Sequence, residues 1–352
     1  MAYTTIDKPS DYFETKLYTG NGGTLNVTGL DFSPNWVWIK SRSSSRVHCL
    51  FDTVRSATKR LQTNEADTEY TTSNSLTGFN SDGFSLGSYN QSNEGSANFV
   101  SWNWKAGTSF SNSAGANGAT LASTGSISTT AGFSIISFTG DGNTGAKIAH
   151  GLGVKPDMII LKMRSVGDTS WGVYHKAIGA TKYLRLNNTG GTVTSNTRWN
   201  NIEPTSTVFT LGSSGDVNQN NATIIAYCFA DVQGYSKMGS YVGNGSDTPN
   251  GVFVYLGFTP AYILIKATDS NSWVIVNNKS PDNSNPVDNS LAADSAAAET
   301  TGDSNTTFNF LSNGFKTNGN SGNNNSSGQE YVFMAFAQRP FVTSTGVPAT
   351  AR

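Results

Sequence analysis

Residue types that carry most enzyme chemistry are few and scattered in this 352-residue chain. His48, His150 and His175 have no second His, Cys or carboxylate at the spacing of a zinc site. The sequence also lacks the motifs of zinc proteases, serine hydrolases, P-loop proteins and dithiol redox proteins. We therefore expect three hydrogen-bonded structural histidines, and neither a metal nor a cofactor. Cys49 and Cys228 are expected to be reduced and structural.

The carboxylates give no catalytic pair. A glycosidase needs two carboxyl groups that face each other across a sugar, but the candidates do not recur at matching places along the chain: Asp82, Asp157, Asp168, Glu203 and Asp231. The segments at Asp67 and Asp141 lack the ligand series of an EF-hand loop, and turn chemistry explains Asp141 and Asn21 better. The protein is expected not to be an enzyme.

Tryptophans could provide platforms on which sugars stack. Six of the seven lie in expected strands, where core packing is the favoured interpretation: Trp36, Trp38, Trp102, Trp104, Trp171 and Trp273. Trp199 differs because it lies in a polar segment between Arg198 and Asn200. These three residues are the candidate surface-recognition site.

The elements that must position these residues recur three times. In each copy a proline is followed, after one residue, by four large apolar residues and a lysine, at 34–40, 156–162 and 260–266. Proline belongs at the start of a strand, and the apolar run predicts a strand buried on both faces that the lysine ends. The segments 54–61 and 177–184 also match, and share Ala-Thr-Lys in phase.

These recurrences predict an all-β protein of three homologous repeats of about 100 residues, an ordinary domain size. Each repeat is expected to be a β-sandwich or jelly-roll-like unit, and an arrangement around one pseudo-threefold axis competes with separate units. The expected organisation is a leader at 1–16, a first repeat at 17–105, a Gly/Ser/Ala/Thr-rich linker at 106–131, a second repeat at 132–235, a third repeat at 236–342 and a C-terminal tail at 343–352.

Two local features extend this prediction. The closing strand at 98–105 alternates, with Phe99 and Ser101 on one face and Trp102 and Trp104 on the other, so one face is expected to be less buried. The third repeat has long Asn-rich loops, in which 290–300 is compatible with a short helix.

Composition narrows the classes of partner. The formal net charge is −1 and only 13% of residues are charged, so nucleic-acid binding has no visible electrostatic source. No apolar run reaches the length of a membrane span, and the N-terminus lacks a signal-peptide core. We therefore expect neither nucleic acid nor membrane insertion, and a chain made in the cytoplasm of its host cell.

The N-terminal segment 2–13, the Thr-Gly-Asn-Gly turn after Leu17, the first Pro-to-Lys strand and the segment 52–59 together resemble an uncharacterised family of structural proteins from marine tailed bacteriophages, including cyanophages. Matching motifs in the second repeat lie at 140–170, 180–182 and 225–230. The likeness covers nearly the whole chain. It implies a virion or tail-fibre protein and carries over no catalytic residue.

The resemblance implies a non-enzymatic virion protein, expected to be a tail-fibre or host-attachment component. Its partners would be other virion proteins, further copies of itself in a homo-oligomer such as a trimer, and a host-surface glycan or protein. The candidate residues for docking to the particle lie in the leader: Tyr3, Ile6, Pro9, Tyr12 and Phe13. A capsid decoration protein is the alternative, and a polysaccharide depolymerase is a more remote one.

Overall fold

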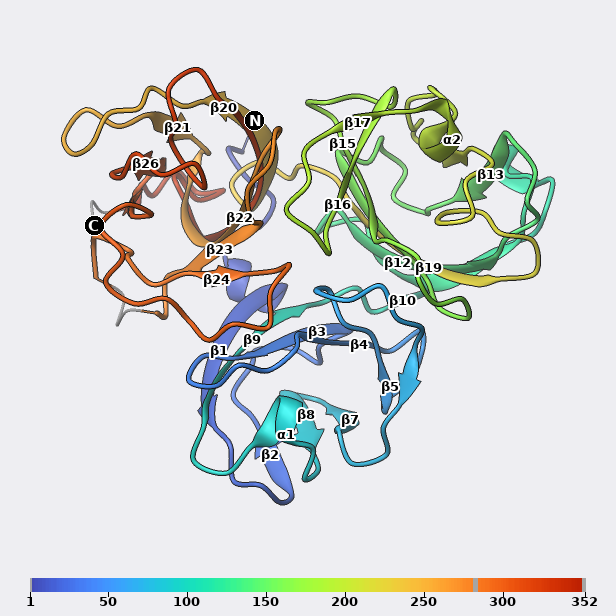
Figure 1. Cartoon of the computed structure of the whole chain (residues 1–352), viewed down its shortest axis with the longest axis horizontal. Coiled ribbons are helices and arrows are strands. Elements are labelled where there is room, and N and C mark those ends of the chain that lie inside the picture. Colours follow the sequence, from blue (N-terminus) through green and yellow to red (C-terminus); the bar gives the residue numbers. More distant parts are fainter. Residues whose placement is uncertain (1, 281–283, 350–352) are drawn as a thin grey trace.

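Antiparallel β-sheets make up almost all of the regular structure (Figure 1). The computed structural model describes residues 2–280 and 284–349. Strands contain 41% of the residues and helices contain 4%, which confirms the expected all-β class. Met1 of the expected leader, residues 281–283 of a third-repeat loop and the last three residues of the expected tail lie outside the described residues.

The chain forms three lobes, of which the first spans residues 13–104 (Figure 1). One of its sheets has the order β1-β9-β3-β4, and a second has the order β2-β8-β7. Its elements, with the short helix that precedes them, are η1 (Pro9–Asp11), β1 (Phe13–Thr19), β2 (Leu25–Val27), β3 (Trp36–Ser41), β4 (Cys49–Asp52), β5 (Lys59–Arg60), β6 (Tyr70–Thr71), β7 (Leu76–Asn80), β8 (Gly83–Leu86), α1 (Asn90–Asn93) and β9 (Asn98–Trp104).

The second lobe spans residues 108–229 and contains the largest sheet, with the order β10-β11-β12-β19-β14-β15-β16-β17. A β13-β18 pair lies on the other side of the lobe core. Its elements are β10 (Thr108–Asn112), η2 (Ala116–Gly118), β11 (Ser123–Ser128), β12 (Phe133–Thr139), β13 (Ala146–Ala149), β14 (Met158–Met163), β15 (Gly172–His175), β16 (Lys182–Arg185), β17 (Val193–Thr194), α2 (Asn196–Trp199), β18 (Val208–Leu211) and β19 (Thr223–Phe229).

The third lobe spans residues 236–340 and has sheets of order β20-β27-β22-β23-β24 and β21-β26-β25. Its strands are β20 (Ser236–Val242), β21 (Phe253–Tyr255), β22 (Phe258–Ala267), β23 (Val274–Asn277), β24 (Leu291–Ala292), β25 (Phe308–Leu311), β26 (Gly314–Thr317) and β27 (Glu330–Pro340). Pro260 lies inside β22 at a register irregularity, a place in a sheet where the missing N–H of proline is tolerated.

In each lobe the strand of the Pro-to-Lys motif lies in the middle of the larger sheet. β3 pairs with β9 and β4, β14 with β19 and β15, and β22 with β27 and β23. Every residue of β3, β14 and β22 is buried, which confirms the prediction of strands buried on both faces. Each of these strands therefore separates two hydrophobic cores.

The outward face of each large sheet packs on the smaller sheet of its own lobe, and the inward face packs on the other two lobes. In β9, Phe99 belongs to the first lobe's own core, whereas Trp102 and Trp104 belong to a central core shared by all three lobes. Both faces of β9 are buried, so the expectation of a less buried face was wrong. Side chains of the other lobes bury the second face of β9 in the central core, and the sequence of one repeat alone does not show this.

Aromatic rings from three lobes meet in this central core. The ring centroids of Trp36 and Tyr227 lie 4.6 Å apart across the first and second lobes, and those of Trp104 and Tyr262 lie 5.7 Å apart across the first and third. Phe229 and Phe336 join the second and third lobes at 6.1 Å. Burial of such large rings contributes strongly to stability, and the lobes therefore pack as one body.

Two expected segments differ in the structure. Residues 106–131, expected to be a linker, contain β10 and β11, which add two strands to the sheet of the second lobe. Ladder hydrogen bonds hold these Ser- and Thr-rich strands although they have few large apolar residues. The segment 290–300 contains β24 and no helix, because Leu291 and Ala292 pair with β23.

Candidate functional site

The predicted recognition site around Trp199 is not a surface. Trp199 is 1% exposed and packs in the core of the second lobe, with its ring centroid 6.0 Å from that of Tyr174. The Arg198 guanidinium is also buried, lies 4.5 Å from the Tyr183 ring centroid and pairs with Asp216. Asn200, half-buried, ends the one-turn helix α2 in a left-handed conformation. The prediction of an exposed contact at Trp199 was wrong.

The leader is part of the folded body. Ile6 and Phe13 are each 2% exposed in the central core, and the Phe13 ring centroid lies 5.0 Å from that of Phe336. Pro9 is buried, and Tyr12 packs edge-on against Tyr235. Ile6, Pro9 and Phe13 are therefore not available to dock on another protein, whereas Tyr12 is half-buried.

Tyr3 remains at the surface of the third lobe. Its hydroxyl donates to the Gly257 carbonyl at 2.9 Å and lies 3.1 Å from the Tyr255 hydroxyl. Tyr3 lines a hollow of the third lobe, described below.

The histidines are buried and hydrogen-bonded, as expected. In each ring Nδ1 accepts from an N–H group and Nε2 lies beside a carbonyl oxygen, an arrangement that requires the Nε2–H tautomer. Burial lowers the pKa of His48 to about 3 and the pKa values of His150 and His175 to about 4. All three rings are thus neutral at pH 7.

Cys49 and Cys228 are free and buried, as predicted.

The motif lysines are buried, contrary to the expectation that they end the buried part of each strand. Lys40, Lys162 and Lys266 are each 0% exposed. Each ammonium group donates to at least one carbonyl of its own lobe and to one carbonyl of a neighbouring lobe. The acceptors across the lobes are Ala296 for Lys40 at 3.2 Å, Ala66 for Lys162 at 3.0 Å and Thr189 for Lys266 at 3.2 Å. Burial lowers the pKa of each lysine to about 8.

A ring N–H makes a second contact at each boundary between lobes. The residue just before β4, β15 or β23 donates to a carbonyl of the neighbouring lobe: His48 to Ala292 at 2.9 Å, Trp171 to Gln62 at 2.8 Å and Trp273 to Arg185 at 2.7 Å. The lysine acceptor lies four positions after the ring acceptor in every lobe. We call these paired contacts the lobe clamps.

A backbone hydrogen bond completes each clamp. The donors and acceptors are Glu299 to Arg42 at 2.8 Å, Glu69 to Arg164 at 2.8 Å and Thr192 to Thr268 at 2.7 Å. At two of the three boundaries the side chains of the same residues also form bidentate ion pairs, Arg42 with Glu299 and Arg164 with Glu69. Bidentate arginine pairs fix orientation as well as adding energy.

A network of buried charged residues also links the first and second lobes. Asp52 and Arg55 are fully buried as an ion pair, and the Tyr227 hydroxyl of the second lobe donates to Asp52 at 2.7 Å. Arg55 also donates to Glu69 at 3.1 Å. Every charge in this network has a partner of opposite sign, and the network joins the two lobes. Asp52 is fully buried, whereas the Glu69 side chain is 11% exposed.

The turn interpretation of Asn21 and Asp141 is confirmed. The side-chain oxygen of Asn21 accepts from the Gly23 N–H, and that of Asp141 accepts from the Asn143 N–H. A buried asparagine holds each turn, Asn93 in the first lobe and Asn218 in the second. These oxygens are thus occupied by turn hydrogen bonds.

The exposed aromatic residues of the third lobe form the most prominent candidate surface. Phe253 and Tyr255 of β21 are 47% and 48% exposed. Beside Tyr255 lies a hollow of about 380 Å³, lined by Tyr3, Asp231, Gln233, Ser236, Lys237, Tyr255, Leu256 and Gly257. We call Phe253, Tyr255 and this hollow the third-lobe surface. Sequence analysis missed it because Phe253 and Tyr255 alternate with buried residues as core strands do.

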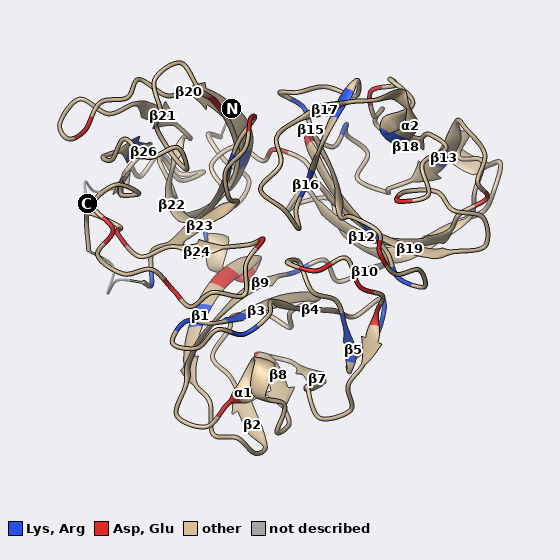
Figure 2. Ribbon diagram, in the orientation of Figure 1, with Lys and Arg blue, Asp and Glu red and all other residues tan. Residues whose placement is uncertain are grey.

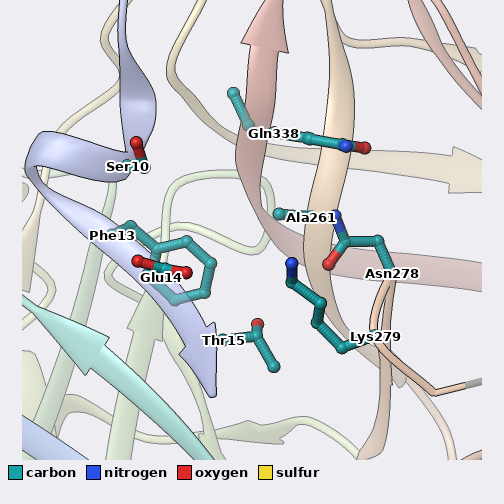
Figure 3. A pocket seen from close by; sticks show the side chains of 9 residues that line it. Ser10, Phe13, Glu14, Thr15, Ala261, Asn278, Lys279 and Gln338 are labelled. Carbon is teal, nitrogen blue, oxygen red and sulfur yellow. The ribbon is translucent and has the colours of Figure 1, made fainter. Parts of the chain in front are cut away.

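A smaller pocket lies between β1 of the first lobe and β22 and β27 of the third (Figure 3). Its volume is about 80 Å³, room for a few water molecules. Figure 3 shows the Lys279 amino group and the Asn278 amide pointing into it, with Glu14 on the opposite side. Thr15 Oγ1 and Asn278 Oδ1 have no protein partner, so water is the fitting occupant.

Charged residues are scattered over all three lobes without a concentrated patch of one sign (Figure 2). Within residues 2–280 and 284–349, no three His, Cys, Asp or Glu side chains gather as metal ligands would. In the same ranges, no helix is long and apolar enough to cross a bilayer.

These features define an all-β protein whose three lobes are joined by the lobe clamps, with two exposed aromatic residues beside a hollow on the third lobe. Residues 8–340 match a family described as a domain of unknown function, DUF7483, and the chain belongs to this family. A search of curated proteins found no match.

Proposed function

We propose that the protein is a non-enzymatic structural component of a tailed bacteriophage particle, and that it serves host attachment in the tail through its third-lobe surface. The observation that carries the proposal is the exposed Phe253 and Tyr255 pair beside a polar hollow. Contiguous exposed apolar patches mark interaction sites, and Phe253 and Tyr255 are the two exposed residues on one face of β21. The phage assignment rests on the sequence resemblance.

The burial of the chemically reactive side chains supports a structural role for the protein. Both cysteines are buried in the cores, and the three histidines, the motif lysines and the Asp52–Arg55 pair are buried in hydrogen bonds that hold turns or lobes in place. A rigid scaffold that presents one distinctive surface suits recognition.

We further infer that the lobes are three copies of one ancestral unit, each built as two packed sheets, around a pseudo-threefold axis. The lobe clamps support this inference. Each uses the same strand position as donor and the same spacing of acceptor carbonyls, and the donors run from the first lobe to the third, from the third to the second and from the second to the first. Such a cyclic order is what a closed ring of three related units requires.

Gold-labelled antibodies on purified particles test the proposed function. We expect label at the tail, in few copies relative to the major capsid protein, and reduced adsorption to host cells when the antibody is bound. Label spread in many copies over the head would contradict attachment and indicate capsid decoration instead. Particles without label would contradict the virion assignment.

A further inference from the structure

The exposed aromatic pair is particular to the third lobe. Val254 packs in the core of that lobe, so Phe253 and Tyr255 on either side of it face outward. Strand pairing places Val254 opposite Phe315, just as it places Val27 opposite Phe84 and Ile148 opposite Phe209. The outward neighbours in the other lobes are polar or small, with Asn26 in the first lobe and Lys147 in the second at the position of Phe253.

The hollow beside Tyr255 combines aromatic faces with hydrogen-bonding groups. The hydroxyls of Tyr3 and Tyr255 lie 3.1 Å apart, and the Lys237 ammonium lies 5.4 Å from the Tyr255 ring centroid. Asp231 lines the same hollow. A volume of about 380 Å³ is within the range of small-molecule sites.

These groups match the chemistry of a sugar. A pyranose presents an apolar C–H face that packs on aromatic rings, and hydroxyls that both donate and accept hydrogen bonds. Lys176 bridges two carboxylates, Asp231 at 2.7 Å and Asp157 at 3.2 Å. With Lys237 in the hollow, these two carboxylates face two lysines, so the formal charges around the hollow cancel, which favours a neutral ligand over a polyanion.

A polypeptide strand fits this surface less well. β21 is an edge strand of three residues, and the Lys237 ammonium donates to the Tyr255 carbonyl at 2.9 Å. Short edges capped by lysine resist the addition of another strand. Recognition by main-chain pairing is therefore blocked at Tyr255.

We infer that the third-lobe surface binds a neutral glycan, with one sugar in the hollow at Tyr255 and Tyr3 and the next against Phe253. The inference rests on the proposed attachment function, because it names the ligand class of the same surface.

Saturation-transfer NMR on the full chain tests this inference, with neutral oligosaccharides of glucose, galactose, mannose and N-acetylglucosamine as probes. We expect at least one probe to bind, and Tyr255→Ala and Phe253→Ala each to weaken binding roughly three- to tenfold. Val242→Ala is the matched control, because Val242 is 57% exposed on β20. It lies five residues from Lys237, about 17 Å along the strand.

Failure of the glycan inference can be told apart from failure of the proposed function. Absence of binding by every probe, or binding that neither aromatic substitution weakens, would overturn the inference. If Tyr255→Ala lowers adsorption of particles to host cells while no probe binds, the partner is a protein or a charged glycan, which overturns the assignment of a neutral glycan and leaves attachment standing. If a probe binds but the particles carry no label, the proposed phage function fails and the glycan site stands.

Discussion

Single residues carry the contacts between lobes, and the buried lysines show this most directly. Lys162 donates to Ala66 at 3.0 Å and to both oxygens of Thr169, at 2.7 and 2.9 Å. A lysine that ends all three occurrences of the motif was visible in the sequence, but its burial was not, because lysine is mostly exposed and one of its acceptors belongs to another lobe.

Lys162→Met is predicted to destabilise the protein by about 2 kcal/mol, because the acceptor oxygens lose their donor inside a closed boundary. Denaturant unfolding followed by tryptophan fluorescence measures the change. Lys182→Met is the control, since Lys182 is exposed at the start of β16, and it should change stability by less than about 0.5 kcal/mol. Equal stability of the two variants would contradict a role for Lys162 in the clamp.

The buried histidines predict acid sensitivity. In the unfolded chain each histidine binds a proton as pH falls below about 6.5, whereas in the folded protein His150 and His175 stay neutral to about pH 4 and His48 to about pH 3. Because the unfolded state binds more protons in this window, stability falls as pH falls, by about 1.4 kcal/mol per pH unit for each histidine.

The pH dependence of unfolding free energy between pH 4 and 6.5 tests this prediction. We expect His150→Asn to reduce the slope by about 1.4 kcal/mol per pH unit, since one titrating group is removed and the carboxylates are unchanged. An unchanged slope in His150→Asn would show that this histidine is not buried and neutral.

Among the elements, the central strands were predictable, whereas β10 and β11 at one edge of the second lobe's large sheet were not. The Pro-to-Lys motif located β3, β14 and β22 to within a few residues, because long apolar runs with a proline before them have few alternatives. β10 and β11 were missed since their Ser and Thr residues pair by backbone and leave no apolar period. Trp199 was misplaced because its polar neighbours form a one-turn helix that directs the indole inward.

A substitution in the leader tests whether this segment is part of the folded body. Ile6→Ala is expected to cost about 2 to 4 kcal/mol, as for other buried aliphatic truncations, because Ile6 is 2% exposed in the central core. Thr5→Ala, at an exposed neighbouring position, should be nearly neutral. The melting temperatures of both variants, compared with that of the unsubstituted protein, test this prediction. If Ile6→Ala behaves like Thr5→Ala, the leader is a free docking segment after all.

At the scale of the molecule, three lobes share one central core and are joined by three lobe clamps. This arrangement could not be derived from one repeat, because the inward face of each sheet is completed only by the other two lobes. The recurrences in the sequence led us to expect three units, but they did not indicate the contacts between lobes, because the donors and acceptors of these contacts lie in different lobes.

We predict that the chain unfolds as one cooperative body rather than as three independent units. Scanning calorimetry of the full chain tests this prediction most directly, together with the variant Lys266→Met at the boundary of the second and third lobes. We predict a single transition whose calorimetric and van't Hoff enthalpies agree, and which moves as a whole to lower temperature in Lys266→Met. Two or three separable transitions, of which the substitution shifts only some, would contradict the account.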